Sequence, residues 1–191
     1  MYTNHYTKNI ILDLDNTLIC SVMYSQNYIV PRDIELKTHN FPKGNCVIYE
    51  RPHLKEILYN LSKKYTISVW TSASKEYGQF VIDKCFPKYI KINFFYSNED
   101  TEFCIEKYHR VKPLEYVYEN NPGYNKLNTI IIDDLVDVSA SNPNNTLQIK
   151  PFIIVTDMYH IYNKKCDKDE ALLMMEDVVY EMFNKIKLNN F

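Results

Sequence analysis

The stretch NIILDLDNTL, residues 9–18, decides how the rest of the chain is interpreted. It is a short apolar run that ends in acidic residues, which indicates a buried strand over residues 8–12 leading into a polar loop. Residues two apart on an extended chain point the same way, so Asp13, Asp15 and Thr17 can converge on one point. A solvated turn is the plain alternative interpretation of these acidic residues.

Further apolar runs alternate with amphipathic segments along the chain. The runs predicted to be strands lie at residues 65–70, 89–96, 128–132 and 147–155. The segments predicted to be helices lie at 52–63 with Pro52 in the first turn, after an N-cap at Ser74, after Pro113 and at 168–187. This alternation predicts an α/β fold, with a mostly parallel sheet and helices on both faces.

Residues 19–50 interrupt this alternation, because they lack a helical period. They hold three β-rich pieces, at residues 28–30, 34–38 and 46–50, separated by Pro and Gly. We interpret them as a small antiparallel β insertion after the first strand. The rest of the chain shows no linker or repeat, so residues 1–191 are expected to form a single domain.

Polar clusters follow the predicted strands, where ligands bind in parallel sheets. Thr71 and Ser72 precede a helix and could bind an anion there, although such residues are more often plain helix caps. Lys112 is expected to be held extended by the proline that follows it. Asp133 and Asp134 lie at the end of a buried run, where a cation would relieve their mutual repulsion; a turn without metal is the alternative.

The composition excludes several classes of function. The formal net charge of −2 gives no general attraction for nucleic acid. The 3 glycines are far apart, so neither a dinucleotide-binding loop nor a P-loop is present. The 5 cysteines are widely spaced without a CxxC pair, which argues against a zinc site or a disulfide framework and indicates reduced thiols.

The chain also shows no signal for export or membrane insertion. Its first residues contain no basic segment followed by an apolar stretch, as a signal peptide would. No apolar run approaches the roughly 20 residues that a membrane helix needs. We therefore expect a soluble, intracellular protein, nuclear or cytoplasmic, with no membrane partner.

Taken together, these motifs resemble a known superfamily. DLDNTL at 13–18, VWTSAS at 69–74, Lys112 and IIDD at 131–134 resemble the haloacid-dehalogenase-like phosphohydrolases. With CVIYERPHLKEIL at 46–58, the chain more narrowly resembles the phosphatases of the RNA polymerase II C-terminal domain (CTD), including the small CTD phosphatases, over about residues 8 to 187. The resemblance implies a three-layer, Rossmann-like fold and phosphatase activity.

The resemblance also implies roles for the acidic residues. Asp13 would be the nucleophile that forms an aspartyl-phosphate, and Asp15 would be the acid–base partner. Mg²⁺ would be held by Asp13, the backbone carbonyl of Asp15, and Asp134. Asp133 would position Lys112 or a metal-bound water.

Further residues would support the phosphoryl group. Lys112, Thr71 and Ser72 would bind its oxygens, and Thr17 would orient the loop. The chain departs from the family in reading Lys-Pro-Leu at 112–114 where Lys-Asp-Leu is usual. The family's arginine is missing before Cys104, and Arg110 is the candidate to replace it.

The short insertion predicts an open site, because it is too small to form a cap domain. An open site suits a phosphorylated protein segment, and we expect phosphoserine or phosphothreonine in a proline-containing peptide such as the polymerase CTD. Alternatives are a capless phosphatase of small molecules or nucleic-acid ends, and a non-catalytic phosphoprotein-binding relative. The insertion's apolar residues could line a substrate groove or form the insertion's own core; they are Tyr28, Ile29, Val30, Ile34, Val47 and Ile48.

Overall fold

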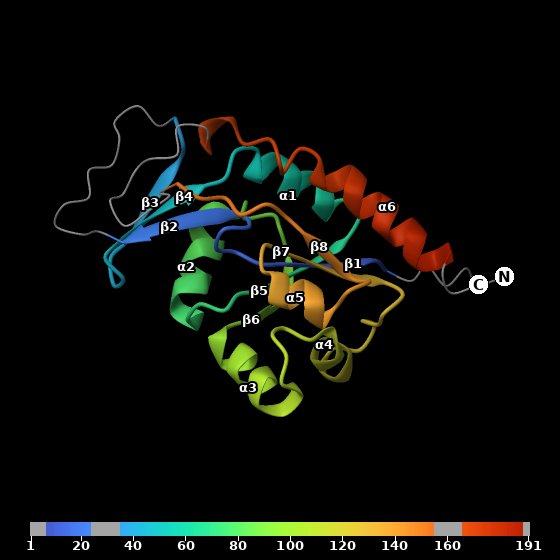
Figure 1. The fold of residues 1–191 in the computed structure, drawn as a ribbon. Helices are drawn as coiled ribbons and strands as arrows, with labels where there is room; N and C mark the ends of the chain where they lie inside the picture. Colours follow the sequence, from blue (N-terminus) through green and yellow to red (C-terminus); the bar gives the residue numbers. More distant parts are fainter. Residues whose placement is uncertain (1–6, 24–34, 155–165, 189–191) are drawn as a thin grey trace.

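The computed structural model describes residues 7–23, 35–154 and 166–188. Its centre is a five-stranded sheet in the order β6-β5-β1-β7-β8, in which all neighbouring strands run parallel (Figure 1). This arrangement confirms the predicted parallel sheet. The strands are β1 (Asn9–Leu12), β5 (Thr66–Trp70), β6 (Ile92–Tyr96), β7 (Thr129–Asp133) and β8 (Thr146–Gln148).

Strand β1 occupies the middle of the sheet and is buried on both faces. Its four residues are apolar apart from Asn9, as expected for a strand covered on both sides. Alternate side chains point to opposite faces, so Ile10 and Leu12 join one core and Ile11 joins the other. Because β1 pairs with both β5 and β7, three predicted strand ends lie side by side.

Helices cover both faces of the sheet and complete three layers (Figure 1). The core on the Leu12 side includes residues of α1 (Leu54–Ser62), α2 (Lys75–Cys85) and α6 (Met175–Leu188). The helices that contribute to the core on the Ile11 side are α3 (Asn98–Tyr108), α4 (Leu114–Asn120) and α5 (Val136–Ser141).

The insertion is a separate antiparallel sheet in the order β2-β4-β3. Its strands are β2 (Ile19–Met23), β3 (Thr38–Phe41) and β4 (Cys46–Glu50), so the predicted antiparallel insertion is confirmed. The predicted piece at 34–38 overlaps β3 only at Thr38, because residues 35–37 are not strand and residue 34 lies outside the described residues. The piece at 28–30 lies outside the described residues.

The groove interpretation fails for the two insertion residues that can be judged. Val47 and Ile48 lie on β4 and are 4% and 0% exposed. Val47 packs with Tyr49 and Phe152, whereas Ile48 joins the main core on the Leu12 side. These side chains therefore form the core; Tyr28, Ile29, Val30 and Ile34 lie outside the described residues.

Several predicted boundaries were wrong because turns, not apolar patterns, set them. Pro52 precedes the first helix, whose N-cap is His53 with a φ of 65°, so the helix begins at Leu54. Strand β8 ends at Gln148 instead of reaching residue 155, which itself lies outside the described part. The terminal helix begins at Met175 instead of residue 168.

Two helices, α3 and α5, were not predicted from the sequence. A capping box opens α3, with the Ser97 side chain at its N-cap and Asp100 accepting a hydrogen bond from the backbone N–H of Ser97 at 2.9 Å. This Ser-x-x-Asp pattern was readable in the sequence. By contrast, Ser74 was correctly predicted to cap α2, since its Oγ accepts a hydrogen bond from the Tyr77 N–H.

Two further properties follow from the described residues. None of their helices is both long enough and apolar enough to cross a membrane. All five cysteines fall within this part of the chain, and each is a buried, free thiol.

Candidate active site

Three carboxylates meet where β1 and β7 end. The register pairs Leu12 with Ile132, and the Asp13 N–H donates to the Ile132 carbonyl at 3.0 Å, so the next residues of both strands lie together. Asp13, Asp133 and Asp134 are all buried, and each offers a carboxylate oxygen within 4.8 Å of the others. The structure thus brings together side chains separated by 120 positions in the sequence, as the motif analysis predicted.

A fully buried lysine compensates part of this negative charge. The Nζ of Lys112 donates to Oδ1 of Asp13 at 2.6 Å and to Oδ2 of Asp133 at 2.7 Å. The position of Asp133 is fixed in turn, because its Oδ1 accepts a hydrogen bond from the Leu135 N–H at 2.9 Å. Lys112 therefore reaches the cluster from the loop between α3 and α4 and orients two of its three carboxylates.

The backbone of Lys112 is not extended, which corrects the prediction from Pro113. Its φ is 46°, in the left-handed region that non-glycine residues rarely adopt. Asn142 holds this conformation, with its Nδ2 donating to the Lys112 carbonyl at 3.0 Å and its Oδ1 accepting from the Leu114 N–H at 2.8 Å. Strained backbone of this kind is retained where the surroundings fix it, often at functional sites.

Burial and charge both perturb ionisation in this cluster. Burial, reinforced by the charge of Asp133, raises the pKa of Asp13 to about 7, although Lys112 opposes the shift. Burial also raises the pKa of Asp134, again with help from Asp133. Burial alone would lower the pKa of Lys112, but the charges of Asp13 and Asp133 raise it, so the ammonium stays charged.

The donor set fits a hard divalent cation. Three ionised carboxylates and one ammonium (−3 + 1) leave a formal charge of −2 in a buried place. Isolated buried charge of this size is unfavourable unless it is paired or coordinates a metal. Carboxylate oxygens are the ligands that Mg²⁺ prefers, and Mg²⁺ would neutralise the remaining charge.

Asp15 has different partners from Asp13. The chain turns after Asp13, with the Leu18 N–H donating to the Leu14 carbonyl at 2.8 Å, so the expected extended run from 13 to 17 is not present. The Asp15 Oδ1 accepts hydrogen bonds from the Tyr77 hydroxyl at 2.6 Å and the Ser21 hydroxyl at 3.1 Å. Burial raises the pKa of Asp15, although these two donors oppose the rise.

Among the other predicted phosphate-binding and supporting residues, Thr17 contacts the acidic cluster, whereas Arg110 bonds to other groups. Thr71 is buried at the end of β5, with its Oγ1 accepting from the Ala73 N–H at 3.1 Å, and Ser72 beside it is exposed. The Thr17 hydroxyl donates to Asp134 at 3.4 Å, so Thr17 joins the cluster. Arg110, however, donates to Glu115 at 3.2 Å and to a backbone carbonyl of α5 at 3.3 Å.

Three supporting residues were not anticipated in their observed roles. Tyr77 lies on α2, and its hydroxyl donates to Asp15. Arg51 is fully buried and donates to the Thr17 carbonyl at 2.8 Å, while its Nε contacts Asp169 at 2.9 Å. Asn142, described above, holds the Lys112 loop; no sequence signal distinguished it.

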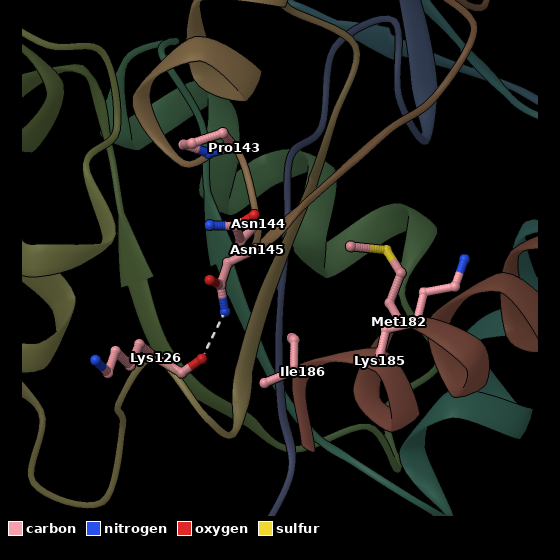
Figure 2. A pocket seen from close by; sticks show the side chains of 7 residues that line it. All are labelled: Lys126, Pro143, Asn144, Asn145, Met182, Lys185 and Ile186. Carbon is pink, nitrogen blue, oxygen red and sulfur yellow. Dashed lines mark hydrogen bonds between the residues drawn. The ribbon is translucent and has the colours of Figure 1, made fainter. Parts of the chain in front are cut away.

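A pocket elsewhere on the surface is separate from this cluster (Figure 2). It lies between α6 and the turn before β8, where Asn145 donates to the carbonyls of Lys126 and Thr129. Thr129 is the first residue of β7, whereas the carboxylates gather at the other end of that strand. The pocket therefore contributes nothing to the chemistry of the acidic cluster.

Comparisons with known proteins agree with this geometry. The family described as NLI interacting factor-like phosphatase matches residues 8–182. The CTD phosphatase-like protein 355R of Invertebrate iridescent virus 6 is 32% identical over 93% of this chain and 100% of its own length. Nuclear envelope morphology protein 1 of Saccharomyces cerevisiae is 30% identical over 76% of this chain, but only 35% of its own length is covered.

Solved structures show the same fold. The fission yeast RNA polymerase II CTD phosphatase Fcp1, bound to beryllium fluoride, superposes with a TM-score of 0.54 at 21% identity and covers 96% of this chain. The chain spans about half the length of that structure, 51%. From its family match and its full-length viral relative, the chain belongs to the NLI interacting factor-like phosphatases, and it shares the fold of Fcp1.

Proposed function

We propose that this chain hydrolyses phosphomonoesters of proteins with the help of Mg²⁺, through an aspartyl-phosphate on Asp13. The observation that carries the proposal is the cluster of Asp13, Asp133 and Asp134 around the buried ammonium of Lys112. A carboxylate that faces the Lys112 ammonium and a bound Mg²⁺ could receive the phosphoryl group of an anionic ester. Mg²⁺, when bound to the carboxylates, would supply charge neutralisation of the phosphoryl oxygens.

In the first step, an Asp13 oxygen forms a bond to phosphorus while the bond to the ester oxygen breaks. Lys112 orients Asp13 through its 2.6 Å contact and places positive charge beside the transferring group. Thr71 and Ser72 lie at the end of β5 and are proposed to donate to the phosphoryl oxygens. The leaving alkoxide takes a proton from Asp15, whose raised pKa favours the protonated form that this step needs.

In the second step, Asp15 is proposed to take a proton from a water molecule that attacks the aspartyl-phosphate. The tyrosine and serine hydroxyls that donate to Asp15 stabilise its ionised form, which is the form needed here. The products are inorganic phosphate and a regenerated Asp13. Asp15 thus serves first as acid and then as base in this proposal, and its hydrogen bonds with Tyr77 and Ser21 orient its carboxyl group.

We propose phosphoserine and phosphothreonine in protein segments as the substrates. The small antiparallel insertion supports this, because it is the segment between β1 and α1 and is too short to be a separate cap domain. The names of the relatives support the same class, since Fcp1 is an RNA polymerase II CTD phosphatase. A polymerase-CTD-like peptide is the specific candidate.

Hydrolysis assays test the mechanism and the substrate separately. For the mechanism, p-nitrophenyl phosphate should be cleaved with Mg²⁺ and not with EDTA, and Asp15→Asn should lower kcat about 10²–10⁴-fold. Asp137→Asn, an exposed acid on α5, is the matched control and should keep full activity. Hydrolysis that is equally fast in EDTA would rule out the proposed mechanism.

Two further measurements complete the test. Borohydride reduction of the reacting enzyme, followed by peptide mass spectrometry, should place the phosphorylated carboxyl at Asp13. For the substrate, phosphoserine and phosphothreonine peptides should be cleaved with a higher kcat/KM than nucleotides or sugar phosphates. The reverse order would replace the protein substrate with a small molecule while leaving the chemistry intact.

A further inference from the structure

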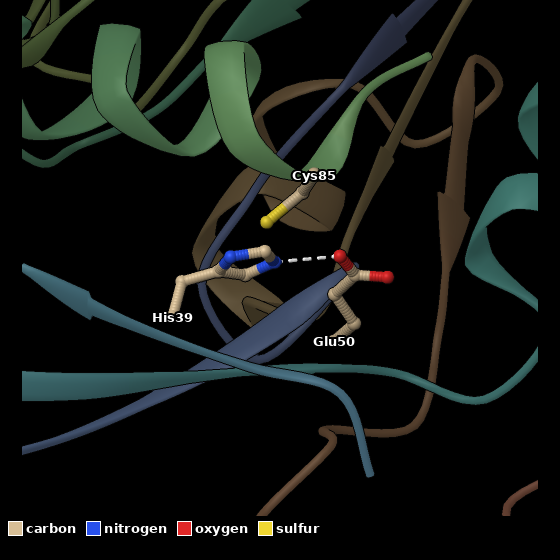
Figure 3. Close-up of side chains that lie close together, drawn as sticks. All are labelled: His39, Glu50 and Cys85. Atoms are coloured by element: carbon tan, nitrogen blue, oxygen red, sulfur yellow. Dashed lines mark hydrogen bonds and ion pairs between the residues drawn. The ribbon is translucent and has the colours of Figure 1, made fainter.

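A second group of metal-ligating side chains lies where the insertion sheet meets α2 (Figure 3). His39 comes from β3, Glu50 is the last residue of β4, and Cys85 is the last residue of α2. Each offers a donor atom within 4.8 Å of the other two. Figure 3 shows the sulfur of Cys85 pointing toward the imidazole of His39, whose Nε2 is 2.7 Å from Glu50 Oε1.

We propose that His39, Glu50 and Cys85 bind Zn²⁺ and so fasten the insertion to α2. Imidazole nitrogen, carboxylate oxygen and thiolate sulfur are the three donor types that proteins use for zinc. Mg²⁺ prefers oxygen ligands, so this mixed set selects a different ion from the acidic cluster. Three protein ligands leave the fourth tetrahedral position to water or another exogenous ligand.

Burial and charge both suit such an ion. Cys85 is fully buried and Glu50 is 6% exposed, whereas the His39 side chain is 14% exposed and leaves a route for entry. With the thiolate and carboxylate ionised and the imidazole neutral, Zn²⁺ makes the group electrically neutral. Neutrality matters here because uncompensated charge in a buried place is costly.

The thiol must lose its proton when the ion binds. Burial, reinforced by the charge of Glu50, raises the pKa of Cys85 to about 12, although Lys37 and Lys55 oppose the shift. Zinc must therefore displace a proton, and its binding should strengthen as pH rises. The two lysines also repel a dication, and both are more exposed than the ligands, so solvent screens them.

The competing interpretation is a metal-free ion pair. Glu50 Oε1 is 2.7 Å from His39 and 3.2 Å from the Nζ of Lys37, which would satisfy the carboxylate without any ion. That interpretation gives no role to the Cys85 sulfur at the imidazole. The two interpretations differ in one measurable respect, because only zinc binding engages the sulfur.

Zinc at this place would also affect Asp15, because it would join the insertion sheet to α2. The donors to Asp15 are Ser21 on β2 of the insertion and Tyr77 on α2. Phe41 on β3 packs edge-on against Tyr77, with ring centroids 5.3 Å apart. Holding β3 and β4 against α2 would therefore fix both donors relative to each other.

Cobalt substitution tests the proposal directly. The purified full chain is stripped with a chelator, and excess Mg²⁺ is then added to fill the acidic cluster before Co²⁺ or Zn²⁺ is titrated. Co²⁺ should bind at one equivalent and produce a thiolate-to-cobalt charge-transfer band. Zn²⁺ should displace Co²⁺, remove the band and raise the thermal unfolding midpoint.

Matched variants test whether the sulfur of Cys85 is a ligand of the ion. Cys85→Ser should abolish the band and weaken Zn²⁺ binding at least about 100-fold, since it removes a ligand outright. Cys104→Ser, at a fully buried cysteine of α3 in the other core, should keep both. His39→Gln, at a more exposed position, repeats the binding test if Cys85→Ser fails to fold, as judged by circular dichroism.

Each outcome decides the question. A band that persists in Cys85→Ser, or that never forms in the wild type, overturns the proposal in favour of the ion pair. A Zn²⁺ effect lost in Asp134→Asn but kept in His39→Gln would place the ion in the acidic cluster and overturn it equally. Phosphatase activity enters none of these readouts, so they are independent of the proposed reaction.

Discussion

Lys112→Met would test the centre of the site, because it keeps a long buried side chain but removes the ammonium shared by Asp13 and Asp133. The wild-type contacts are 2.6 and 2.7 Å long, and the Lys112 side chain is completely shielded from solvent. The substitution leaves two carboxylates without their cation. Both the stability of the fold and the rate of reaction should therefore fall.

The magnitude of the stability loss depends on pH. Breaking a buried ion pair by removing one partner costs about 3–5 kcal/mol. Protonation of Asp13 can relieve part of this, because its pKa is already about 7 with Lys112 in place and rises further without it. The destabilisation should thus be smaller at pH 6 than at pH 8, where ionised Asp13 has no compensating charge. Since Lys112 also faces the transferring group, kcat should fall about 10²–10³-fold.

Two assays measure these effects. Urea unfolding in EDTA at pH 6 and pH 8 gives the stability difference, and p-nitrophenyl phosphate hydrolysis in saturating Mg²⁺ gives kcat. Lys126→Met, at an exposed lysine beside the pocket of Figure 2, is the control and should change neither quantity. These roles of Lys112 are refuted if Lys112→Met unfolds at the wild-type urea concentration at pH 8 while retaining wild-type kcat.

The remaining predictions concern three other residues. Tyr77→Phe removes a 2.6 Å donor to the carboxylate of Asp15, so the pKa of Asp15 should rise and the pH optimum of kcat should shift upward; an unchanged pH profile would contradict this role. Arg51→Met leaves the Asp169 carboxylate without its counter-charge and should destabilise the fold by about 3–5 kcal/mol in urea unfolding, with a wild-type midpoint as the contrary result. Because the pKa of Asp13 is raised from 3.8 to about 7, the folded state binds more protons at this residue than the unfolded state between these pH values. The free energy of unfolding in EDTA should therefore fall as pH rises from about 4 to about 7, and it should fall more steeply in the wild type than in Asp13→Asn. Parallel pH curves for the two proteins would disprove the shift.

The parallel sheet could be predicted because its strands are nearly continuous apolar runs. β1, β5 and β7 are buried on both faces, and such strands can be recognised from their apolar runs alone, without knowing which strands they pair with. Their ends then located Asp13, Thr71 and Asp133, since the carboxyl ends of parallel strands share one edge. The sequence therefore predicted which residues meet, and the catalytic roles given to them stay predictions.

Features set by pairing partners or by turns could not be predicted in the same way. β3 reads Thr-His-Asn-Phe, which is short and has a poor β-former, Asn40, in its middle, and it is defined by its antiparallel pairing with β4. The left-handed backbone of Lys112 depends on Asn142, which is 30 positions away. Neither the pairing of β3 with β4 nor the contact of Asn142 with Lys112 can be predicted from local propensity.

The His39, Glu50 and Cys85 group shows the same limit for metal sites. The absence of a CxxC pair argued against a zinc site. That argument detects ligands that are close along the chain, whereas these residues are spaced 11 and 35 positions apart. Only the packing of the insertion against α2 brings their donor atoms together.

The central place of β1 has a consequence for the nascent chain. Both of its neighbours are made later, since β5 begins at Thr66 and β7 ends at Asp133. At typical synthesis rates, a ribosome needs on the order of ten seconds to add the residues that separate β1 from the end of β7. During that interval the most apolar strand of the sheet has an open edge, so chaperone binding during translation should concentrate on the first 20 or so residues.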